Sequence, residues 1–317
     1  MSVLMEVKDL KVHFPLKGGG LLQKPKLLKA VDGVSFALEK GRSLGIVGES
    51  GCGKTTAALA MVGLRAPSSG EIKIDGEPVY GVDRLRAARL VQLVFQDPYS
   101  SLNPRATIYT TISRAMRLHG LAEGTDLRTR IASLLETVGL RGEHMDRFPH
   151  QFSGGQRQRL CIARALALSP QILVGDEPVS ALDVSVQAQI LNLLLRLQKD
   201  LGLSMVIISH NLAVVEYLCD DIIVMYLGKV VERGAYDDIT RRALHPYTQA
   251  LIAAAPSGPG RSASARAAPK GELPSPIDPP PGCPFNPRCE RATDLCRKSM
   301  PALQSRGERH GVACHHA

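Results

Sequence analysis

The sequence predicts an α/β protein whose strands form a parallel sheet, and three observations support this fold class. The first is a set of short apolar runs with the length of buried strands, at Leu44–Val47, Ile172–Gly175, Met205–Ser209 and Ile222–Tyr226. The second is that segments with helical spacing of apolar residues separate these runs. The third is a glycine-rich loop between the first run and a helical segment. Strands that alternate with helices favour a parallel sheet covered on both faces.

The N-terminal part is predicted to supply strands, a loop and the first helix. Residues 3–14 and 30–47 show the short apolar alternations of β-structure, interrupted at Gly41. Between them, Lys17–Lys29 contains three consecutive glycines and a proline, so we expect a surface loop there. A helix is predicted over Lys54–Leu64, directly after the glycine-rich loop.

The middle of the chain is predicted to be helical from about Asp97 to Leu168. Within Arg128–Leu140, residues at three- and four-residue spacing form one apolar face, namely Ile131, Leu134, Leu135 and Val138. A later amphipathic helix, Val186–Leu201, is expected to bury Ile190, Leu194, Leu197 and Leu201. We therefore expect residues 97–168 to form a helical insertion in an α/β core made of residues 1–96 and 169–255.

The C-terminal part changes in composition at about Ala255. Residues 256–282 are crowded with Pro, Gly, Ser and Ala and include three consecutive prolines at 279–281, which predicts an extended, partly disordered linker. Residues 283–317 are basic and rich in Cys and His, so we expect a short extension after the linker.

Composition and charge narrow the classes of function. Aromatic residues make up only 4% and Trp is absent, which argues against surfaces that stack on nucleic-acid bases. The net charge of +9 is compatible with several anionic partners and does not choose among them. The first residues lack the apolar segment of a signal peptide, and no uncharged apolar run reaches the roughly 18–20 residues of a membrane span. We expect a protein of a reducing compartment that reaches a membrane only through a partner.

The loop after Leu44–Val47 carries a phosphate-binding motif. Gly48-Glu-Ser-Gly-Cys-Gly-Lys54-Thr55, here called the phosphate loop, matches G-x-x-x-x-G-K-[ST], in which backbone N–H groups surround phosphate oxygens. Lys54 is expected to reach the β- and γ-phosphates and Thr55 to ligate Mg²⁺, while the N-terminus of the next helix adds partial positive charge. The predicted nucleotide-binding residues here are Gly48, Glu49, Ser50, Gly51, Cys52, Gly53, Lys54, Thr55 and Thr56.

Two carboxylates, Asp176 and Glu177, follow the apolar run Ile172–Gly175. In the phosphate-loop template a carboxylate at this position holds the Mg²⁺ ion, and we assign that role to Asp176. Glu177 points to the other face, where we expect it to polarise the attacking water as a general base. The alternative is a carboxylate pair that merely ends a strand in solvent, and the phosphate loop argues against it.

A third motif brings a family resemblance. Phe152-Ser-Gly-Gly-Gln156, here called the signature loop, resembles the signature motif of ABC ATPases with Phe in place of Leu. The other motifs of that family also occur, in the family's order, within residues 5–250. They are at Phe14, Gln96, Ser180–Asp183 and His210. The resemblance implies a RecA-like P-loop NTPase core with an inserted helical signature subdomain, and ATP and Mg²⁺ as cofactors.

The resemblance also implies a dimer. Two subunits face each other head to tail, and each ATP is held by one subunit's phosphate loop and the other's Ser153, Gly154, Gly155 and Gln156. The implied catalytic residues are Glu177, His210, Gln96 and Asp183, of which His210 holds the γ-phosphate and Asp183 links the two sites. The implied Mg²⁺ ligands are Thr55, Gln96 and Asp176. Phe14 is implied to stack on adenine; the plainer alternative for Phe14 and for His210 is an ordinary core side chain.

Three further segments narrow the family. Phe95–Arg105, Arg147–Gly155 and His245–Leu251 are similar to segments of dipeptide and oligopeptide importer ATPases. That group implies an ATP-hydrolysing subunit that powers peptide import from the cytoplasmic face of the cell (inner) membrane, as a homodimer or heterodimer. The implied partners are two membrane permease subunits, which residues 97–105 are expected to face, and indirectly an extracytoplasmic substrate-binding protein; nucleic acid is not expected. A soluble, non-transport ABC ATPase is the alternative, and the cargo stays open.

The extension carries four cysteines in the pattern Cys283-x₅-Cys289-x₆-Cys296-x₁₇-Cys314. So short a segment lacks a core, and a thiolate-bound metal centre can replace one. The pattern resembles the C-terminal extension of peptide-importer ATPases, some of which hold a [4Fe–4S] cluster, and we favour that cluster over zinc. Cysteines that are unligated or joined in disulfides stay open as well, and His310, His315 and His316 lie nearby in the sequence as substitute ligands.

Overall fold

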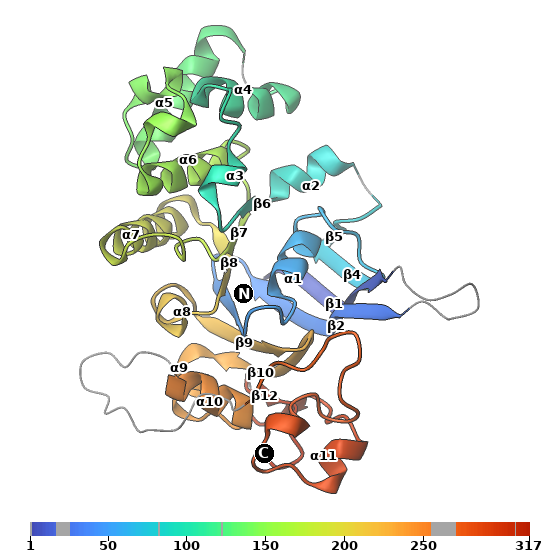
Figure 1. Ribbon diagram of the computed structural model, residues 1–317. Coiled ribbons are helices and arrows are strands. Elements are labelled where there is room, and N and C mark those ends of the chain that lie inside the picture. Colours follow the sequence, from blue (N-terminus) through green and yellow to red (C-terminus); the bar gives the residue numbers. More distant parts are fainter. Residues whose placement is uncertain (1, 17–25, 82, 122, 255–270, 308) are drawn as a thin grey trace.

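The computed structural model describes residues 2–16, 26–81, 83–121, 123–254, 271–307 and 309–317. Within these ranges, the larger of two sheets has the strand order β11-β12-β10-β9-β3-β8-β7-β6 (Figure 1). Its strands are β3 (Ser43–Val47), β6 (Val91–Val94), β7 (Ile172–Asp176), β8 (Ser204–Ser209), β9 (Asp221–Tyr226), β10 (Lys229–Ala235), β11 (Gln304–Ser305) and β12 (Gly311–Val312). The neighbours from β9 to β6 are parallel, as the alternation of strands and helices predicted. An antiparallel edge of β10, β12 and β11 was not predicted.

The smaller sheet is antiparallel and has the order β2-β1-β4-β5. Its strands are β1 (Val3–Pro15), β2 (Leu27–Glu39), β4 (Ser69–Ile74) and β5 (Glu77–Pro78). The predicted β-rich segment 30–47 is therefore divided between two sheets, because the chain turns between β2 and β3. The predicted loop Lys17–Lys29 is wrong at its end, where Leu27–Lys29 already pairs with β1; its residues 17–25 lie outside the described ranges.

Helix α1 (Lys54–Met61) packs between the two sheets (Figure 1). Its buried face consists of small residues and one flexible one, namely Ala57, Ala58, Ala60 and Met61. Alanines allow the helix to approach strands of both sheets closely. The helix begins at Lys54, as predicted, and ends three residues before the predicted Leu64. The N-terminus of α1 is thereby held at the end of β3.

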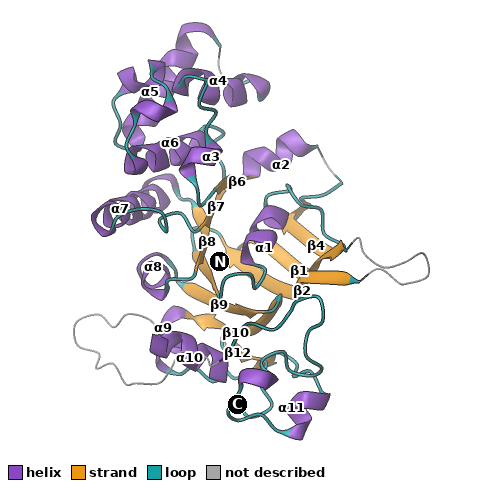
Figure 2. Ribbon diagram, viewed as in Figure 1, coloured by secondary structure: helices purple, strands orange, loops and turns teal. Residues whose placement is uncertain are grey.

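Helices occupy the chain between β6 and β7 and gather beyond one edge of the larger sheet (Figure 2). They are α3 (Pro98–Ser101), α4 (Ile108–Leu118), α5 (Gly124–Thr137), the short 3₁₀ turns η1 (Gly142–Asp146) and η2 (Pro149–Gln151), and α6 (Gly154–Leu166). The apolar face predicted around α5 is buried at Ile131, Leu135 and Val138. A further helix, α2 (Arg84–Leu90), precedes β6.

The helices after β7 cover the larger sheet. They are α7 (Val184–Leu201), α8 (Leu212–Leu218), α9 (Tyr236–Arg241) and α10 (Pro246–Ala254). In α7 the predicted core residues Ile190, Leu194 and Leu197 are buried. Leu201 was predicted to be buried and is instead 52% exposed. It is the last residue of the helix, and the left-handed Gly202 turns the chain away at that point.

The C-terminal extension is joined to the larger sheet (Figure 1). It contains η3 (Asn286–Arg288) and α11 (Asp294–Lys298), and its strand β12 pairs with β10. The extension therefore contributes a strand to the sheet. The sequence did not predict this pairing, because the extension was recognised only by its cysteines and histidines. Of the predicted linker 256–282, residues 256–270 lie outside the described ranges, and residues 271–282 contain no helix or strand.

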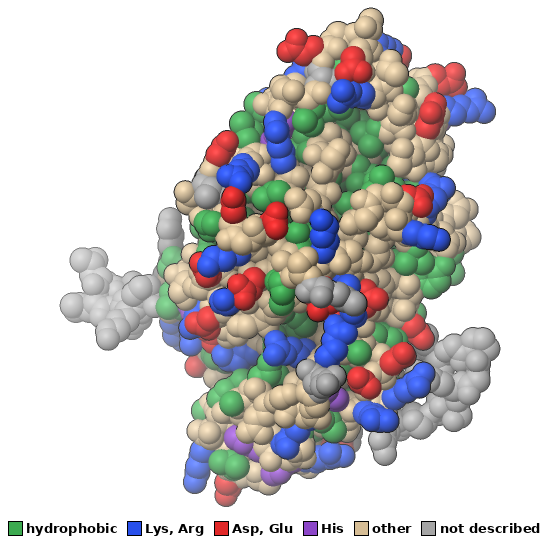
Figure 3. All heavy atoms as spheres, turned by 180° about the vertical axis from the view of Figure 1, so that it is seen from behind, with side chains coloured by type: hydrophobic (Ala, Val, Ile, Leu, Met, Phe, Trp, Pro, Cys, Tyr) green, Lys and Arg blue, Asp and Glu red, His purple; other side chains and the backbone are tan. Residues whose placement is uncertain are grey.

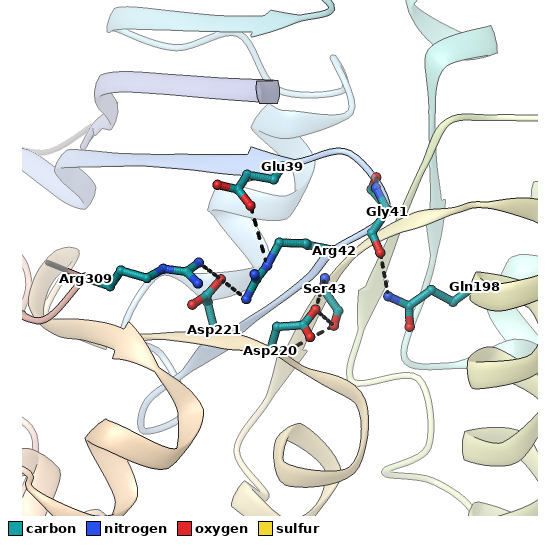
Figure 4. A network of polar contacts seen from close by, with 9 residues as sticks. Glu39, Gly41, Arg42, Ser43, Gln198, Asp220, Asp221 and Arg309 are labelled. Carbon is teal, nitrogen blue, oxygen red and sulfur yellow. Dashed lines mark hydrogen bonds and ion pairs between the residues drawn. The ribbon is translucent and has the colours of Figure 1, made fainter. Parts of the chain in front are cut away.

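A polar network attaches the end of the extension to the sheet (Figure 4). The Asp221 carboxylate accepts hydrogen bonds from Arg42 Nη2 at 3.0 Å and from Arg309 Nη2 at 2.7 Å. Burial raises the pKa of the Asp221 carboxyl, and the two guanidinium groups act against that rise. Beside it, the Asp220 carboxylate accepts from both the backbone N–H and the hydroxyl of Ser43.

Charges on the surface are mixed. Figure 3 shows Lys and Arg side chains interspersed with Asp and Glu on the face seen from behind. Among the residues that the structure describes, no helix has the length and apolar character that crossing a membrane requires.

Candidate functional site

The phosphate loop connects β3 to α1 and is closed around Lys54. Gly53 has φ of 105°, and a Cβ there would lie 2.0 Å from the carbonyl oxygen of Ala30, so only glycine fits. The buried Lys54 ammonium donates to the carbonyl oxygens of Gly48 at 2.8 Å and Glu49 at 3.0 Å. The loop thus curls around its own lysine at the N-terminus of α1, the arrangement that cradles phosphate.

The other predicted residues of the loop differ in exposure. Ser50, Gly51 and Thr55 are exposed, and Thr56 is half-buried. Cys52 is buried beneath the loop, and this burial raises the pKa of its thiol. A thiol of this kind is a packing residue more than a nucleophile.

Asp176 ends β7 at the same edge of the sheet. Its side chain is buried, and its Oδ1 atom has no hydrogen-bond partner in the described residues. Burial raises the pKa of this carboxyl, and a hydrogen bond from the Thr55 side chain lowers it in part. A buried carboxylate oxygen without a partner, next to a hydroxyl, is a donor set that suits Mg²⁺.

Glu177 lies at the centre of a three-residue contact. Its Oε1 is 2.9 Å from His210 Nδ1, and its Oε2 accepts a hydrogen bond from Gln96 Nε2 at 3.3 Å. These side chains follow β7, β8 and β6, whose carboxyl ends meet at one edge of the sheet. The structure therefore brings together three of the four predicted catalytic residues.

The signature loop forms the start of α6. Ser153 caps the helix: its hydroxyl accepts from the N–H of Gln156 at 3.4 Å, and the Gln156 side chain accepts from the N–H of Ser153 at 3.1 Å. Behind the loop, Gln158 Nε2 donates to the carbonyl oxygen of Pro178 at 2.7 Å, which links α6 to the residue after Glu177. Within the described chain, no hydrogen bond or ion pair joins Ser153–Gln156 to Gly48–Thr56.

Asp183 and Phe14 take no part in the contact of Glu177 with His210 and Gln96. Asp183 is exposed and precedes α7 without a side-chain capping bond. Phe14 is half-buried on β1, and the guanidinium of Arg65 lies 5.0 Å from the centre of its ring. That ring is covered by a cation on one side, which sequence reasoning did not foresee.

The four cysteines of the extension lie near one another as free thiols. The pKa of the Cys283 thiol is raised to about 11, chiefly by burial; a hydrogen bond with the backbone of Phe285 acts against the rise, and the charges of Cys296, Cys314 and Cys289 contribute to it. Among the described residues, no group of three or more His, Cys, Asp or Glu is arranged to hold a metal ion.

The three histidines of the extension differ in their contacts. His316 Nε2 is 3.4 Å from Cys296 Sγ, so it remains beside the cysteines. His310 Nε2 instead contacts the Glu232 carboxylate at 2.8 Å, and His315 Nε2 contacts the carbonyl oxygen of Ser299 at 2.9 Å. His310 and His315 thus have other partners.

Two residues near the phosphate loop were missed from the sequence. Arg288, in the extension, forms a two-pronged ion pair with Glu49. The hydroxyl of Tyr247 accepts a hydrogen bond from the N–H of Glu49 at 2.8 Å. Tyr247 lies in the segment His245–Leu251, which the sequence indicated only as a mark of the family. No spacing rule connects either residue to the loop.

The fold and the site together define a P-loop ATPase with the motifs of an ATP-binding cassette. Residues 31–180 match the sequence pattern of the ABC transporter family. Residues 231–296 match the pattern of the oligopeptide/dipeptide transporter C-terminal region. The chain belongs to the ABC transporter ATP-binding proteins, in the dipeptide and oligopeptide transporter group.

Full-length relatives agree with this family. The dipeptide transport ATP-binding protein DppF of Haemophilus influenzae is 46% identical over 316 residues, covering 99% of this chain and 96% of that protein. The oligopeptide transport ATP-binding protein OppF of Escherichia coli is 48% identical over 321 residues, covering 99% and 96%. The oligopeptide transport ATP-binding protein AppF of Bacillus subtilis is 44% identical over 320 residues, covering 99% and 97%.

Solved structures show the same fold. The ATP-binding cassette MJ0796, a dimer in a post-hydrolysis state with ADP and phosphate, has a TM-score of 0.64 and 27% identity, covering 74% of this chain and 99% of that chain. The transporter subunit cbiO1 of Clostridium perfringens also has a TM-score of 0.64 and 27% identity, covering 76% and 92%. The membership of the ABC ATPase family that the motifs predicted is therefore confirmed.

Proposed function

We propose that this chain hydrolyses ATP to power the import of dipeptides or oligopeptides through a membrane permease. The observation that carries the proposal is the contact of Glu177 with His210 and Gln96 beside a closed phosphate loop. Relatives named as dipeptide and oligopeptide transport ATP-binding proteins, matched along nearly their whole length, support peptides as cargo. They favour transport over a soluble, non-transport ABC ATPase.

The proposed reaction assigns a role to each side chain of the site. Lys54 and the N–H groups of the phosphate loop bind the β- and γ-phosphates, and Phe14 stacks on adenine. Glu177 accepts a proton from the attacking water, while Gln96 and His210 orient the Glu177 carboxylate and the γ-phosphate. Mg²⁺ held by Thr55, Gln96 and Asp176 would neutralise charge on the phosphates.

The active unit in this proposal is a dimer of ATPase subunits, identical or different. Ser153–Gln156 of one subunit completes the phosphate site of the other and stabilises the charge of the transition state. The separation of the two loops within this chain and the dimeric cassettes among its structural neighbours support the arrangement. Asp183, exposed at the start of α7, is free of internal capping bonds and is proposed to link the two sites.

We divide the chain into four proposed units. Residues 1–96 and 169–255 form the RecA-like core, residues 97–168 the helical signature subdomain, residues 256–282 the linker, and residues 283–317 the Cys-rich extension. The helices from α3 to α6, set beyond the edge strand β6, support the second of these units (Figure 2).

Residues 97–105 are the proposed contact with the permease. Asp97 caps α3 by accepting from the N–H groups of Tyr99 and Ser100. Tyr99 is 66% exposed, and the guanidinium of Arg157 lies 3.9 Å from the centre of its ring. An exposed aromatic residue held in place by a cation is suited to receive a partner helix. This contact would keep the chain at the cytoplasmic face of the membrane as a peripheral subunit, with a substrate-binding protein engaging the permease from the other side.

The four cysteines of the extension are proposed to hold a [4Fe–4S] cluster with a structural role. Four free thiols that share one neighbourhood are the donor set for such a cluster, and a bound cation would favour the thiolates that burial disfavours.

Replacement of the general base tests the function. In the complex purified with its permease, Glu177→Gln should lower ATP turnover by about 10²- to 10⁴-fold, the usual contribution of a positioned base, while ATP still binds. Wild-type turnover in this variant would refute the assignment.

Purification in detergent tests the partners. A transporter subunit should co-purify with two multi-span membrane proteins. A chain that elutes alone under these conditions would support the soluble, non-transport alternative.

A further inference from the structure

Glu49, the second residue of the phosphate loop, directs its side chain to the C-terminal extension. Arg288 Nη1 lies 2.8 Å from Glu49 Oε2, and Arg288 Nη2 lies 3.1 Å from Glu49 Oε1. The two side chains come from positions 239 residues apart. A pair of parallel N–H···O bonds between guanidinium and carboxylate fixes orientation as well as distance.

Arg288 is held on its other side by aromatic rings. Its guanidinium lies 5.8 Å from the centre of the Tyr226 ring and 5.9 Å from that of Phe285, and Nη1 is 3.4 Å from the Tyr226 hydroxyl. The Arg288 side chain is 6% exposed, against 25% for Glu49. An ion pair this well buried is costly to break, because removal of one partner leaves the other charge without compensation.

The backbone of Glu49 is restrained as well. Its N–H donates to the hydroxyl of Tyr247, which is fully buried and packs against Tyr226 and Phe285. Its carbonyl oxygen accepts from Lys54 Nζ. Glu49 is therefore fixed at its N–H by α10, at its carbonyl by the phosphate-binding lysine, and at its side chain by the extension.

We propose that Arg288 is a positioning residue for ATP: by holding Glu49, it keeps the phosphate loop in the shape that binds phosphate. The inference rests on the proposed nucleotide site and adds to it a residue from outside the cassette core. Lys54 donates to the carbonyl oxygens of Gly48 and Glu49, so a shift of Glu49 displaces the ammonium that meets the phosphates. Arg288 acts on ATP binding and leaves Glu177, His210 and Gln96 untouched.

The test compares nucleotide binding and turnover in the assembled transporter. Arg288→Gln and Glu49→Gln should each raise the Kd of a fluorescent ATP analogue and the KM for ATP by about ten- to a hundredfold, as expected for loss of hydrogen bonds between charged groups. For Arg288→Gln, the kcat at saturating ATP should stay within about twofold of wild type, because the loss is in ground-state and transition-state binding alike. Arg297→Gln is the matched control, since Arg297 forms an exposed ion pair with Asp294 in the same extension.

A charge exchange separates positioning from simple attachment of the extension. The double variant Arg288→Glu with Glu49→Arg should recover part of the affinity that each single variant loses, and Arg288→Lys, which keeps the charge without the planar fork, should lie between wild type and Arg288→Gln. A lowered melting temperature with unchanged Kd and KM would overturn the proposal, as would a fall in kcat alone. A wild-type chain that binds ATP and imports no peptide would defeat the proposed function and leave this inference standing.

Discussion

At the scale of single residues, the backbone of Glu177 is held in a conformation that side chains rarely adopt. Its φ is 49°, in the left-handed region, which costs a residue other than glycine about 1–3 kcal/mol. The N–H of Glu177 donates to the carbonyl oxygen of Ile208 at 2.9 Å, and its carboxylate contacts His210 and Gln96. These contacts offset the strain and fix the position of the carboxylate.

His245 provides a prediction about pH. Burial lowers the pKa of this imidazole to about 4, whereas an unfolded histidine titrates near about 6.5. As pH falls below about 6.5, His245 becomes protonated in the unfolded chain and stays neutral in the folded chain. The free energy of unfolding should therefore fall by about 3 kcal/mol between pH 6.5 and 4. Above pH 6.5 the contribution is fully present. Urea unfolding at pH 7 and pH 4.5 measures it.

The controls for this prediction are two histidine replacements. His245→Gln should show a flatter dependence of unfolding free energy on pH than wild type. His150→Gln removes an exposed histidine and should keep the wild-type slope. Equal slopes in all three proteins would show that His245 does not carry the effect.

Much of the site could be predicted at this scale, because strand ends obey a simple rule. Gln96, Glu177 and His210 each follow an apolar run, and parallel strands bring such residues to one edge. Arg288 could not be found in this way. Its partner Glu49 lies 239 positions away, and only the folding of the extension onto β10 brings the two together.

At the scale of elements, the signature loop depends on how closely α6 approaches α7. A Cβ on Gly155 would lie 2.4 Å from Val186 Cγ1, whereas a Cβ on Gly154 would meet only Leu182 Cδ2 at 3.7 Å. The two adjacent glycines therefore differ: one is required by packing against α7, and the other has room for a methyl group.

This difference predicts opposite effects on stability. Gly155→Ala should lower the free energy of unfolding by about 1–3 kcal/mol through overpacking. Gly154→Ala should be neutral or slightly stabilising, because alanine favours helix over glycine. Adding Val186→Ala to Gly155→Ala should restore part of the loss, as measured by thermal unfolding. Equal destabilisation by both alanine variants would contradict the close approach.

The extension gives a second prediction for an element. The purified protein should contain iron with the absorbance of a [4Fe–4S] cluster, and replacing Cys289 and Cys296 together by Ser should abolish it, because thiolates are the ligands that such clusters require. Replacing the buried Cys161, which lies outside the extension, should leave the spectrum unchanged. An unchanged spectrum in the double variant would refute the cluster.

The elements themselves were predicted unevenly. Strands β7, β8 and β9 and helix α7 follow directly from apolar periodicity. The antiparallel sheet of β1, β2, β4 and β5 does not, since alternation identifies a strand without naming its partner. For the same reason the short strand β12 was missed, because two residues carry no period of their own.

At the scale of the whole molecule, no hydrogen bond or ion pair among the described residues joins the phosphate loop to the signature loop, as the proposed division of the ATP site between two subunits requires. The phosphate loop lies at the end of β3, and the signature loop lies on α6, after the helices that follow β6. The extension, in contrast, is bound to the phosphate loop through Arg288 and to β9 through Arg309. We interpret the core and the extension as one framework for the nucleotide, and the signature loop as a surface offered to a second subunit.

Peptide uptake by the assembled transporter tests the central claim most directly. Proteoliposomes that contain the permease, this chain and its partner ATPase, with ATP on the side of the ATPases, would be supplied with binding protein and labelled peptide. We predict ATP-dependent accumulation with the wild-type chain and a loss of at least about a hundredfold with Glu177→Gln, the contribution of a general base. Accumulation that is equal in the two preparations would contradict the account.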